Sequence, residues 1–277
     1  MSNLVSTQWL AEHLADPNMV VLDATWHLPT AQRNAHDEFL SAHISGAQFF
    51  DIDKTSDLSS TLPHTLPSAS QFEAQIGALG IRSSTRVVVY DSYGLFSAAR
   101  CWWMFKIFGH DNVAVLDGGL KKWLAEGRSV QTGEPVVPKP AQFNAVLNPK
   151  MVRNLDEVAA GSAQIADARS PTRFRGEEAE PRLGVRAGHI PGARNVHYAS
   201  VLAADGTLRP RPELLNLFAS SGLNVDQPIV TSCGSGVTAA ILSLALTELD
   251  AEDHALYDGS WAEWGSSTRP IATGPAV

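Results

Sequence analysis

The chain has few cysteines, little clustered positive charge and no long apolar run, and each shortage excludes a class of protein. Its two cysteines, Cys101 and Cys233, cannot build a disulfide framework, and neither has the spacing of a zinc site. No apolar stretch approaches the ~18 residues of a membrane span. A net charge of −8 with scattered Lys and Arg argues against nucleic acid or an anionic membrane as partner. We therefore expect a small-molecule substrate and no metal.

Residues 1–20 contain no Lys or Arg and show the apolar pattern of an amphipathic helix. A secretory signal begins with basic residues, so this start does not resemble one. The expected location is the cytoplasm.

The sequence contains an internal repeat of two copies. "AHISGA" at 42–47 returns as "GHIPGA" at 188–193, and "VLDGGLKKW" at 115–123 returns as "LYDGSWAEW" at 256–264, in the same order. Two copies of this length indicate a duplicated domain. The stretch 132–150 between them holds four prolines and reads as a linker. We predict domains over 1–131 and 151–277.

Each copy alternates short β-branched runs with helical patterns. The runs at 87–90, 113–116 and 229–232 favour strands, and the patterns at 69–79 and 212–220 favour helices. Such alternation predicts an α/β fold in which each domain has a mainly parallel sheet flanked by helices. Ligands in these folds bind at the carboxyl ends of the strands.

Aligning the copies on Gly94 and Gly236 places Asp91 where the second copy has Cys233. Only the second copy then keeps a candidate nucleophile at its strand end. We expect the chemistry to be confined to that copy, with the first copy covering the site and supplying part of its wall.

The loop that follows the strand at 229–232 reads Cys-Gly-Ser-Gly, with a helix expected to begin near Gly236. Glycines let successive N–H groups point inward, and a helix N-terminus adds partial positive charge, so this loop should bind an anion. The same field should favour the thiolate of Cys233. The alternative is that Cys233 is a small, inert, buried residue in a tight turn. The residues near the loop must distinguish these two interpretations.

Five arginines precede the second "HIxGA" turn in a chain with only 21 basic residues. Together they could hold a carboxylate beside the thiolate, because guanidinium binds carboxylate in a planar fork. The alternative is a solvated loop whose charge is balanced by glutamates. The arginines are Arg169, Arg173, Arg175, Arg182 and Arg186, and the glutamates are Glu177, Glu178 and Glu180.

Four features together, "CGSGVTAA", the paired "HIxGA" turns, "DARSPTRFRG…EPR" and "YDGSWAEW", resemble the tandem-domain rhodanese-type sulfurtransferases over roughly residues 4–270. The loop is similar to that of the 3-mercaptopyruvate branch. In the thiosulfate branch the two residues after the cysteine are typically basic, whereas here they are Gly234 and Ser235.

This resemblance implies roles for particular residues. Cys233 corresponds to the nucleophile that accepts sulfur, and Arg173 and Arg182 correspond to arginines that bind the carboxylate and carbonyl oxygens of the substrate. The residues implied to form the cradle are Gly234, Ser235, Gly236, Val237 and Thr238.

The resemblance also implies that His43 could act in a relay with the loop serine and an aspartate eleven residues before the histidine. That position is Gln32. We therefore favour the interpretation that His43 and its counterpart His189 brace their turns. Asp23 and Asp167, at strand ends, are expected to be structural.

The implied reaction moves the sulfur of 3-mercaptopyruvate through a Cys233 persulfide to thioredoxin, a small thiol or cyanide, with no cofactor. Thiosulfate as donor and a non-catalytic rhodanese-like module remain alternatives. A cysteine phosphatase would need an arginine six residues after the nucleophile, where Ala239 stands. Cys101, among bulky apolar residues, is expected in the core.

Overall fold

A computed structural model describes residues 2–276 of the chain, which divide into two compact units. Unit 1 contains the residues up to Asp57, Leu66–Leu147 and the short segment Ala204–Leu208. Unit 2 contains Leu58–Thr65, Asn148–Ala203 and the residues from Arg209 onward. Each unit is thus built mainly from one copy of the repeat and completed by a short segment of the other copy.

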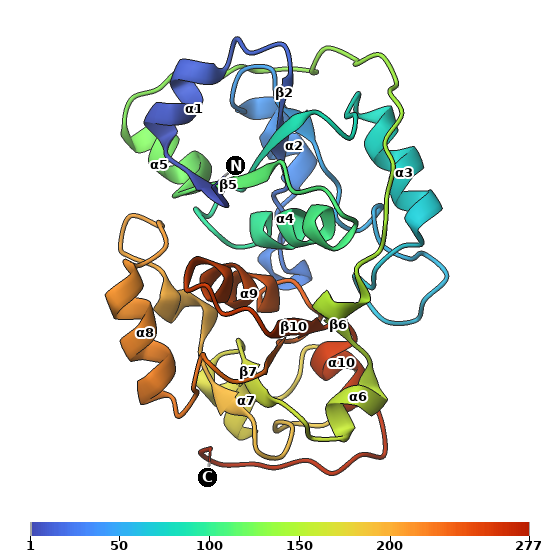
Figure 1. The fold of residues 1–277 in the computed structure, drawn as a ribbon, viewed down its shortest axis with the longest axis vertical. Coiled ribbons are helices and arrows are strands. Elements are labelled where there is room, and N and C mark those ends of the chain that lie inside the picture. The colour runs from blue at the N-terminus through green and yellow to red at the C-terminus, as the bar shows by residue number, and fades with distance from the viewer. Residues whose placement is uncertain (1, 277) are drawn as a thin grey trace. The chain divides into compact units, whose positions relative to one another are not determined.

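Unit 1 is built on a five-stranded parallel sheet of order β1-β5-β4-β2-β3. Strands β2 and β5 of this sheet are labelled in Figure 1. Its strands are β1 (Leu4–Val5), β2 (Met19–Asp23), β3 (Gln48–Phe49), β4 (Arg86–Tyr90) and β5 (Val113–Leu116). Its helices are α1 (Thr7–His13), η1 (Pro29–Ala31), α2 (Ala35–Ser41), α3 (Ala69–Ala78), α4 (Ala98–Ile107) and α5 (Gly119–Ala125).

Unit 2 repeats this topology with a parallel sheet of order β6-β10-β9-β7-β8. Its strands are β6 (Val152–Arg153), β7 (Gln164–Asp167), β8 (Arg194–Asn195), β9 (Ile229–Ser232) and β10 (His254–Tyr257). Its helices are η2 (Pro149–Met151), α6 (Leu155–Ala159), α7 (Pro171–Arg175), η3 (Tyr198–Val201), α8 (Arg211–Ser220), α9 (Ala239–Glu248) and α10 (Ser260–Trp264). The predicted α/β class with a parallel sheet in each copy is confirmed.

Helix α9 is the buried helix of unit 2, as its apolar faces predict. Its residues 239–246 are all buried, and it packs on β9 and β10. Its one polar group in that stretch, the Ser243 hydroxyl, lies 2.9 Å from the Thr231 hydroxyl of β9, so burial leaves neither oxygen unpaired. The helix begins at Ala239 and not near Gly236, because Gly236 adopts φ +80°.

The first twenty residues do not form one helix. Helix α1 covers only Thr7–His13, with the Ser6 hydroxyl accepting a hydrogen bond from the Trp9 N–H at its start, and strands β1 and β2 lie on either side. The turn around Asp16 and the β-branched run that follows it outweigh the amphipathic pattern. None of the helices in residues 2–276 has the length and apolar composition that crossing a bilayer requires.

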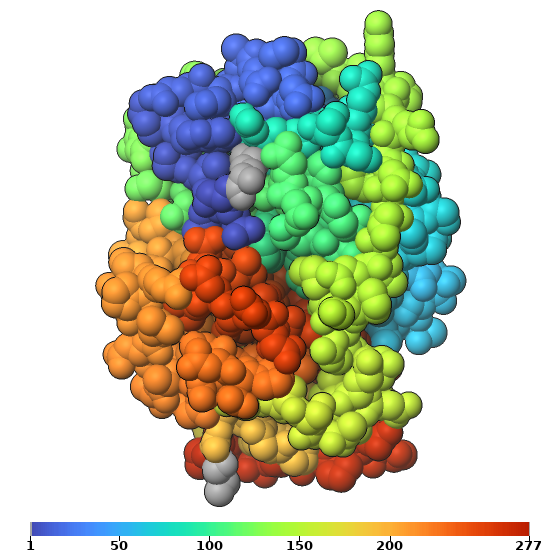
Figure 2. All heavy atoms as spheres, viewed as in Figure 1, coloured from blue at the N-terminus to red at the C-terminus, as the bar shows by residue number. Residues whose placement is uncertain are grey.

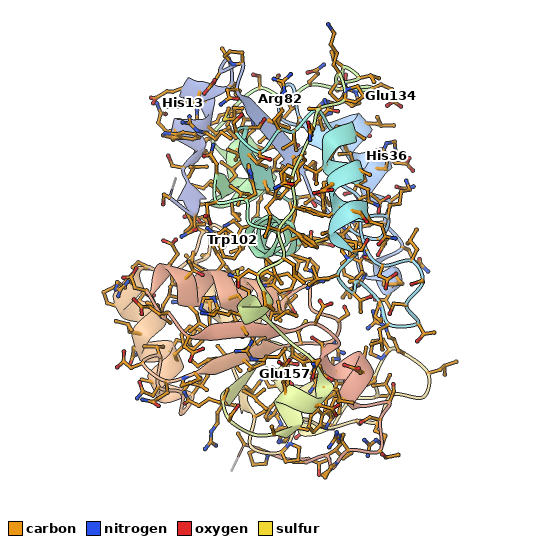
Figure 3. All side chains as sticks on the ribbon, turned by 45° about the vertical axis from the view of Figure 1, so that its right-hand side comes forward. His13, His36, Arg82, Trp102, Glu134 and Glu157 are labelled. Atoms are coloured by element: carbon orange, nitrogen blue, oxygen red, sulfur yellow. The ribbon has the colours of Figure 1, made fainter. Side chains whose placement is uncertain are left out.

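The proline-rich segment carries no helix or strand between residues 132 and 148. Val136 and Val137 are 81% and 88% exposed there, and the yellow-green spheres of this segment reach the surface in Figure 2. Glu134 marks the same segment at the outer edge of Figure 3. The part of this segment up to Leu147 belongs to unit 1, so its role as a linker stays a prediction.

Cys101 is a core residue, as expected. It lies fully buried on α4 beside Trp102, which is labelled in Figure 3, and burial raises the pKa of its thiol well above the ordinary value. A thiol that cannot ionise is a poor nucleophile, so Cys101 is unsuited to sulfur chemistry.

Asp23 ends strand β2 in the core of unit 1 and is only 2% exposed. Burial raises the pKa of its carboxyl group to about 6, although hydrogen bonds from the Thr25 hydroxyl and N–H act in the opposite direction. Because the folded-state pKa exceeds that of the unfolded chain, the contribution of Asp23 to stability is present below about pH 4 and is lost as the pH rises through about 6.

Replacing Asp23 with Asn should remove this loss while keeping the oxygen that accepts from Thr25. The advantage of Asp23→Asn over wild type in unfolding free energy should grow by about 2 to 3 kcal/mol between pH ~4 and pH ~7. Urea unfolding at both pH values measures it, with the exposed Asp226→Asn as control. A difference that stays constant with pH would contradict the assignment.

Candidate active site

Cys233 follows strand β9 directly and is 2% exposed. The loop that it begins is fixed through its carbonyl groups: the N–H of Trp261 donates to the Cys233 carbonyl at 2.9 Å, and that of Ala262 donates to Gly234 at 3.0 Å. The Cys233 N–H donates to the Ser260 hydroxyl at 3.3 Å. Helix α10 thus holds the start of the loop through two backbone N–H groups and the Ser260 hydroxyl, and leaves the following amides uncommitted.

Those amides form a row of open donors. Within residues 2–276, no protein atom accepts a hydrogen bond from the N–H groups of Gly234, Ser235, Gly236, Val237 or Thr238. The row stands at the N-terminus of the ten-residue helix α9, whose dipole adds partial positive charge. Buried amides require an acceptor, so this loop is built for an anionic group.

The matching loop of unit 1 shows what such a cradle binds. Asp91 is fully buried, and its carboxylate accepts four backbone N–H groups at 2.7 to 3.1 Å. The donors are Tyr93, Gly94, Phe96 and Ala98. In unit 1 the anion is therefore a side chain of the protein itself, and the loop is closed to a ligand.

Residues at the same distance after Asp91 and after Cys233 are equivalent in the two loops. This equivalence identifies the amides that an anion on Cys233 would use. The donors two, three and five residues after Asp91 correspond to Ser235, Gly236 and Thr238. All three are open in unit 2, where a sulfur carried by Cys233 would take the place of the carboxylate.

Each loop is covered by the segment that its unit takes from the other copy. In unit 1, Gly206 lies so close to the Asp91 loop that a Cβ on Gly94 would stand 3.2 Å from its Cα. In unit 2, the Nδ1 of His64 lies 2.9 Å from the Ser235 hydroxyl, and both side chains are buried. His64 has φ +60°, a conformation that few residues other than Gly, Asn, Asp and His adopt.

Sequence reasoning overlooked His64, although a signal was present. The family resemblance implies an aspartate eleven residues before the relay histidine, and Asp53 stands eleven residues before His64. Eleven residues before His43 stands Gln32. Applying the spacing to every histidine would have selected His64.

His43 has a different role. It is fully buried in unit 1, where its Nδ1 donates to the Phe39 carbonyl at 2.8 Å and its ring stacks on Phe39. His189 has the same environment in unit 2, with its Nδ1 2.7 Å from the Phe174 carbonyl and its ring on Phe174. The two histidines brace equivalent turns, so we replace His43 by His64 as the candidate partner of Ser235.

The five arginines make different contacts. Arg169 is buried between Asp167 at 2.6 Å and Glu180 at 2.9 Å, and it lies over the ring of Trp261 at 4.4 Å. This anchors the segment and gives Asp167 the structural role expected of it. Arg186 donates to the carbonyls of Gly265, Ser267 and Arg269. Arg175 pairs with Glu177 at the surface.

Arg173 and Arg182 both lie near the loop: Arg173 is close to Gly234, and Arg182 interacts electrostatically with Cys233. Arg173 is paired with Glu180, and a Cβ on Gly234 would stand 3.2 Å from its Nη2. Arg182 is half-buried, and no atom in residues 2–276 accepts a hydrogen bond from its guanidinium. Burial and the neighbouring Arg173 lower its pKa, while Cys233 and Glu180 act in the opposite direction. Arg182 is thus an open cation beside the thiol.

No group of three His, Cys, Asp or Glu side chains in the described part of the chain is placed to hold a metal ion. The arrangement consists of a cysteine with open amide donors and an unpaired arginine. Its chemical capacity is to bind an anionic substrate and to hold an anionic sulfur covalently.

Comparisons with known proteins agree with this arrangement. A family model for the rhodanese-like domain matches residues 6–126 and 152–267. The chain is 44% identical to the 3-mercaptopyruvate sulfurtransferase of Escherichia coli K12, over 95% of this chain and 94% of that protein. It is 42% identical to the mitochondrial thiosulfate/3-mercaptopyruvate sulfurtransferase 1 of Arabidopsis thaliana, over 95% of this chain and 76% of that protein.

The crystal structure of SseA from Escherichia coli, a 3-mercaptopyruvate sulfotransferase, superposes with a TM-score of 0.86 at 41% identity. It covers 94% of this chain and 99% of SseA. The chain therefore belongs to the rhodanese-like family and contains two rhodanese-like domains.

His64→Asn should lower kcat/KM for sulfur transfer about 10- to 100-fold, because it removes the imidazole from Ser235. Asparagine tolerates positive φ, so the backbone should be retained. The matched control, His43→Asn, removes a turn brace and should lower the melting temperature while leaving kcat per folded molecule unchanged. Equal kinetic losses in both variants would contradict the assignment of His64.

Proposed function

We propose that this protein is a 3-mercaptopyruvate sulfurtransferase that carries sulfur as a persulfide on Cys233. The observation that carries the proposal is the open row of amides after Cys233, where the equivalent row in unit 1 binds a carboxylate. The relatives named above bear this activity in their names.

The first half-reaction uses the arginines and the thiolate. Arg182, with the unbonded Nη1 of Arg173, holds the carboxylate and keto oxygen so that the substrate sulfur lies against Cys233. The thiolate attacks that sulfur, an S–S bond forms and the C–S bond breaks. The electron pair of the C–S bond passes into the enolate of pyruvate, which then takes a proton.

Ser235 and His64 are placed to supply that proton. The hydroxyl and the imidazole are already hydrogen-bonded, and Ser235 is two residues from the nucleophile. A buried serine–histidine pair can pass a proton to a developing enolate and be reprotonated from the histidine. The role of His64 is therefore proton delivery and not nucleophilic attack.

The amides hold the product of this step. A persulfide ionises more readily than a thiol, and its outer sulfur replaces the carboxylate that fills the equivalent cradle. In the second half-reaction a thiol attacks the outer sulfur, forms a new S–S bond and restores the Cys233 thiolate. The acceptors that fit are a dithiol protein such as thioredoxin, a small thiol, or cyanide in an assay.

Thiosulfate is the second candidate donor, because the Arabidopsis relative carries both names. The uncharged Gly234 and Ser235 favour the keto acid, since thiosulfate is a dianion that gains from fixed cations at the loop. A side chain at position 234 would also press against Arg173. A non-catalytic role fits unit 1, whose loop is filled by Asp91, and not unit 2.

Domains at 1–131 and 151–277 with the linker at 132–150 remain part of this proposal, as does a cytoplasmic location. Cell fractionation with an antibody tests the location directly.

Cys233→Ser should abolish turnover without unfolding the protein, because a hydroxyl neither ionises near neutral pH nor carries a persulfide. Intact-mass spectrometry after exposure to 3-mercaptopyruvate should show one added sulfur on the parent and none on the variant. The matched control is Cys101→Ser, which should still gain the sulfur. Sulfur mapped to Cys101, or turnover by Cys233→Ser, would refute the assignment.

Arg182→Ala should raise KM for 3-mercaptopyruvate by about 10- to 150-fold, since a lost charge-assisted contact costs about 1.5 to 3 kcal/mol. Arg175→Ala, which removes the same charge from a surface ion pair, should leave KM within about twofold. Steady-state kinetics with a single acceptor measures both. A wild-type KM for Arg182→Ala would place the carboxylate elsewhere.

A further inference from the structure

Glu180 stands outside the reaction just described, yet it is the most buried charged partner of the substrate-binding arginines. Its side chain is 3% exposed. One carboxylate oxygen accepts from Nη1 of Arg169 at 2.9 Å, and the other accepts from Nη2 of Arg173 at 2.5 Å. In the sequence it looked like one of three acidic residues balancing a solvated loop, and its burial separates it from the other two.

The position of Glu180 is fixed from the interior. Arg169, which holds it, is 1% exposed and is bonded to Asp167, to the Gly188 carbonyl and over the Trp261 ring. Glu180 therefore cannot follow Arg173 toward solvent. It holds the Arg173 guanidinium beside the backbone of Gly234, and within residues 2–276 no atom accepts a hydrogen bond from Nη1.

Glu180 keeps the net charge of the groups around the Cys233 sulfur small. Arg169, Arg173 and Arg182 carry three positive charges, and Asp167 and Glu180 carry two negative charges. One positive charge remains for the groups around the sulfur, with the Cys233 thiolate itself not counted, and this matches a keto acid with a single carboxylate. Without Glu180 two would remain, which suits a dianion, because attraction grows with the product of the charges.

We propose that Glu180 sets the donor specificity of this site: it neutralises Arg173 and holds it beside Gly234, so that a monoanionic keto acid is oriented and a dianionic donor is disfavoured. This inference rests on the proposed function. Glu180 touches no substrate and acts through Arg173, so it is a positioning residue.

The test is Glu180→Gln, which keeps the shape of the side chain and removes its charge. With one acceptor, kcat for 3-mercaptopyruvate should fall about tenfold as Arg173 loses its orientation, while kcat/KM for thiosulfate should rise. The ratio of the two kcat/KM values should move at least about tenfold toward thiosulfate, and added salt should diminish the gain because it screens the extra charge.

The matched control is Glu177→Gln, which removes the same charge from an exposed ion pair with Arg175. Its donor ratio should stay within about twofold of wild type. If Glu180 only supports the fold, Glu180→Gln will lower kcat/KM for both donors by the same factor and leave their ratio unchanged. That result overturns the proposal.

Glu180→Asp decides the matter if the glutamine variant does not fold. It keeps the charge and retracts the carboxylate, so kcat for 3-mercaptopyruvate should fall while the donor ratio stays within about twofold. A tenfold shift toward thiosulfate in this variant would refute the role of charge. Persulfide formation on wild-type Cys233 is measured separately, so failure of this inference is distinguishable from failure of the proposed function.

Discussion

A row of buried backbone N–H groups follows a parallel strand in each unit, and these groups require an acceptor. The two units satisfy this requirement differently. In unit 1, Asp91 meets it with its own carboxylate, which accepts four amides. In unit 2, Cys233 brings no such oxygen, and the amides stay open. One duplicated loop is therefore closed by a carboxylate in one copy and open in the other.

The arginine-rich segment of unit 2 complements this loop. Arg169 and Arg186 are committed to carboxylates and carbonyls, so they shape the segment and do not bind a ligand. Arg182 is left without a partner in the described chain, and Arg173 is half-committed through Glu180. The net charge of the site thus depends on which arginines are paired with carboxylates, and not only on the number of arginines.

Much of this organisation could be predicted from the sequence, because it is local. Strands β5 and β9 occupy the ranges predicted from short apolar runs, and the burial of α9 follows from its apolar faces. The contrast between Asp91 and Cys233 was visible in the alignment of the two copies. Features with a short repeat or a distinctive composition are encoded within a few neighbouring residues.

The parts that could not be predicted depend on contacts between distant residues. The bond between His64 and Ser235 joins positions 171 residues apart, and it exists because unit 2 takes the segment 58–65 from the first copy. Glu180 and Glu177 look alike in the sequence but differ in burial and in the arginines that they pair with. The prediction of a helix over residues 1–20 was wrong because the pairing of β1 with β5 and of β2 with β4 outweighed local periodicity.

If the open amides hold the outer sulfur of a Cys233 persulfide, backbone NMR of the loop will detect the new hydrogen bonds. Amide proton shifts would be compared before and after one equivalent of 3-mercaptopyruvate, with the added sulfur confirmed by mass. Downfield shifts are expected for Ser235, Gly236 and Thr238, and unchanged shifts for Tyr93 and Gly94, whose amides already bind Asp91. Persulfidation that leaves the amide shifts of Ser235, Gly236 and Thr238 unchanged would show that these amides do not hold the sulfur.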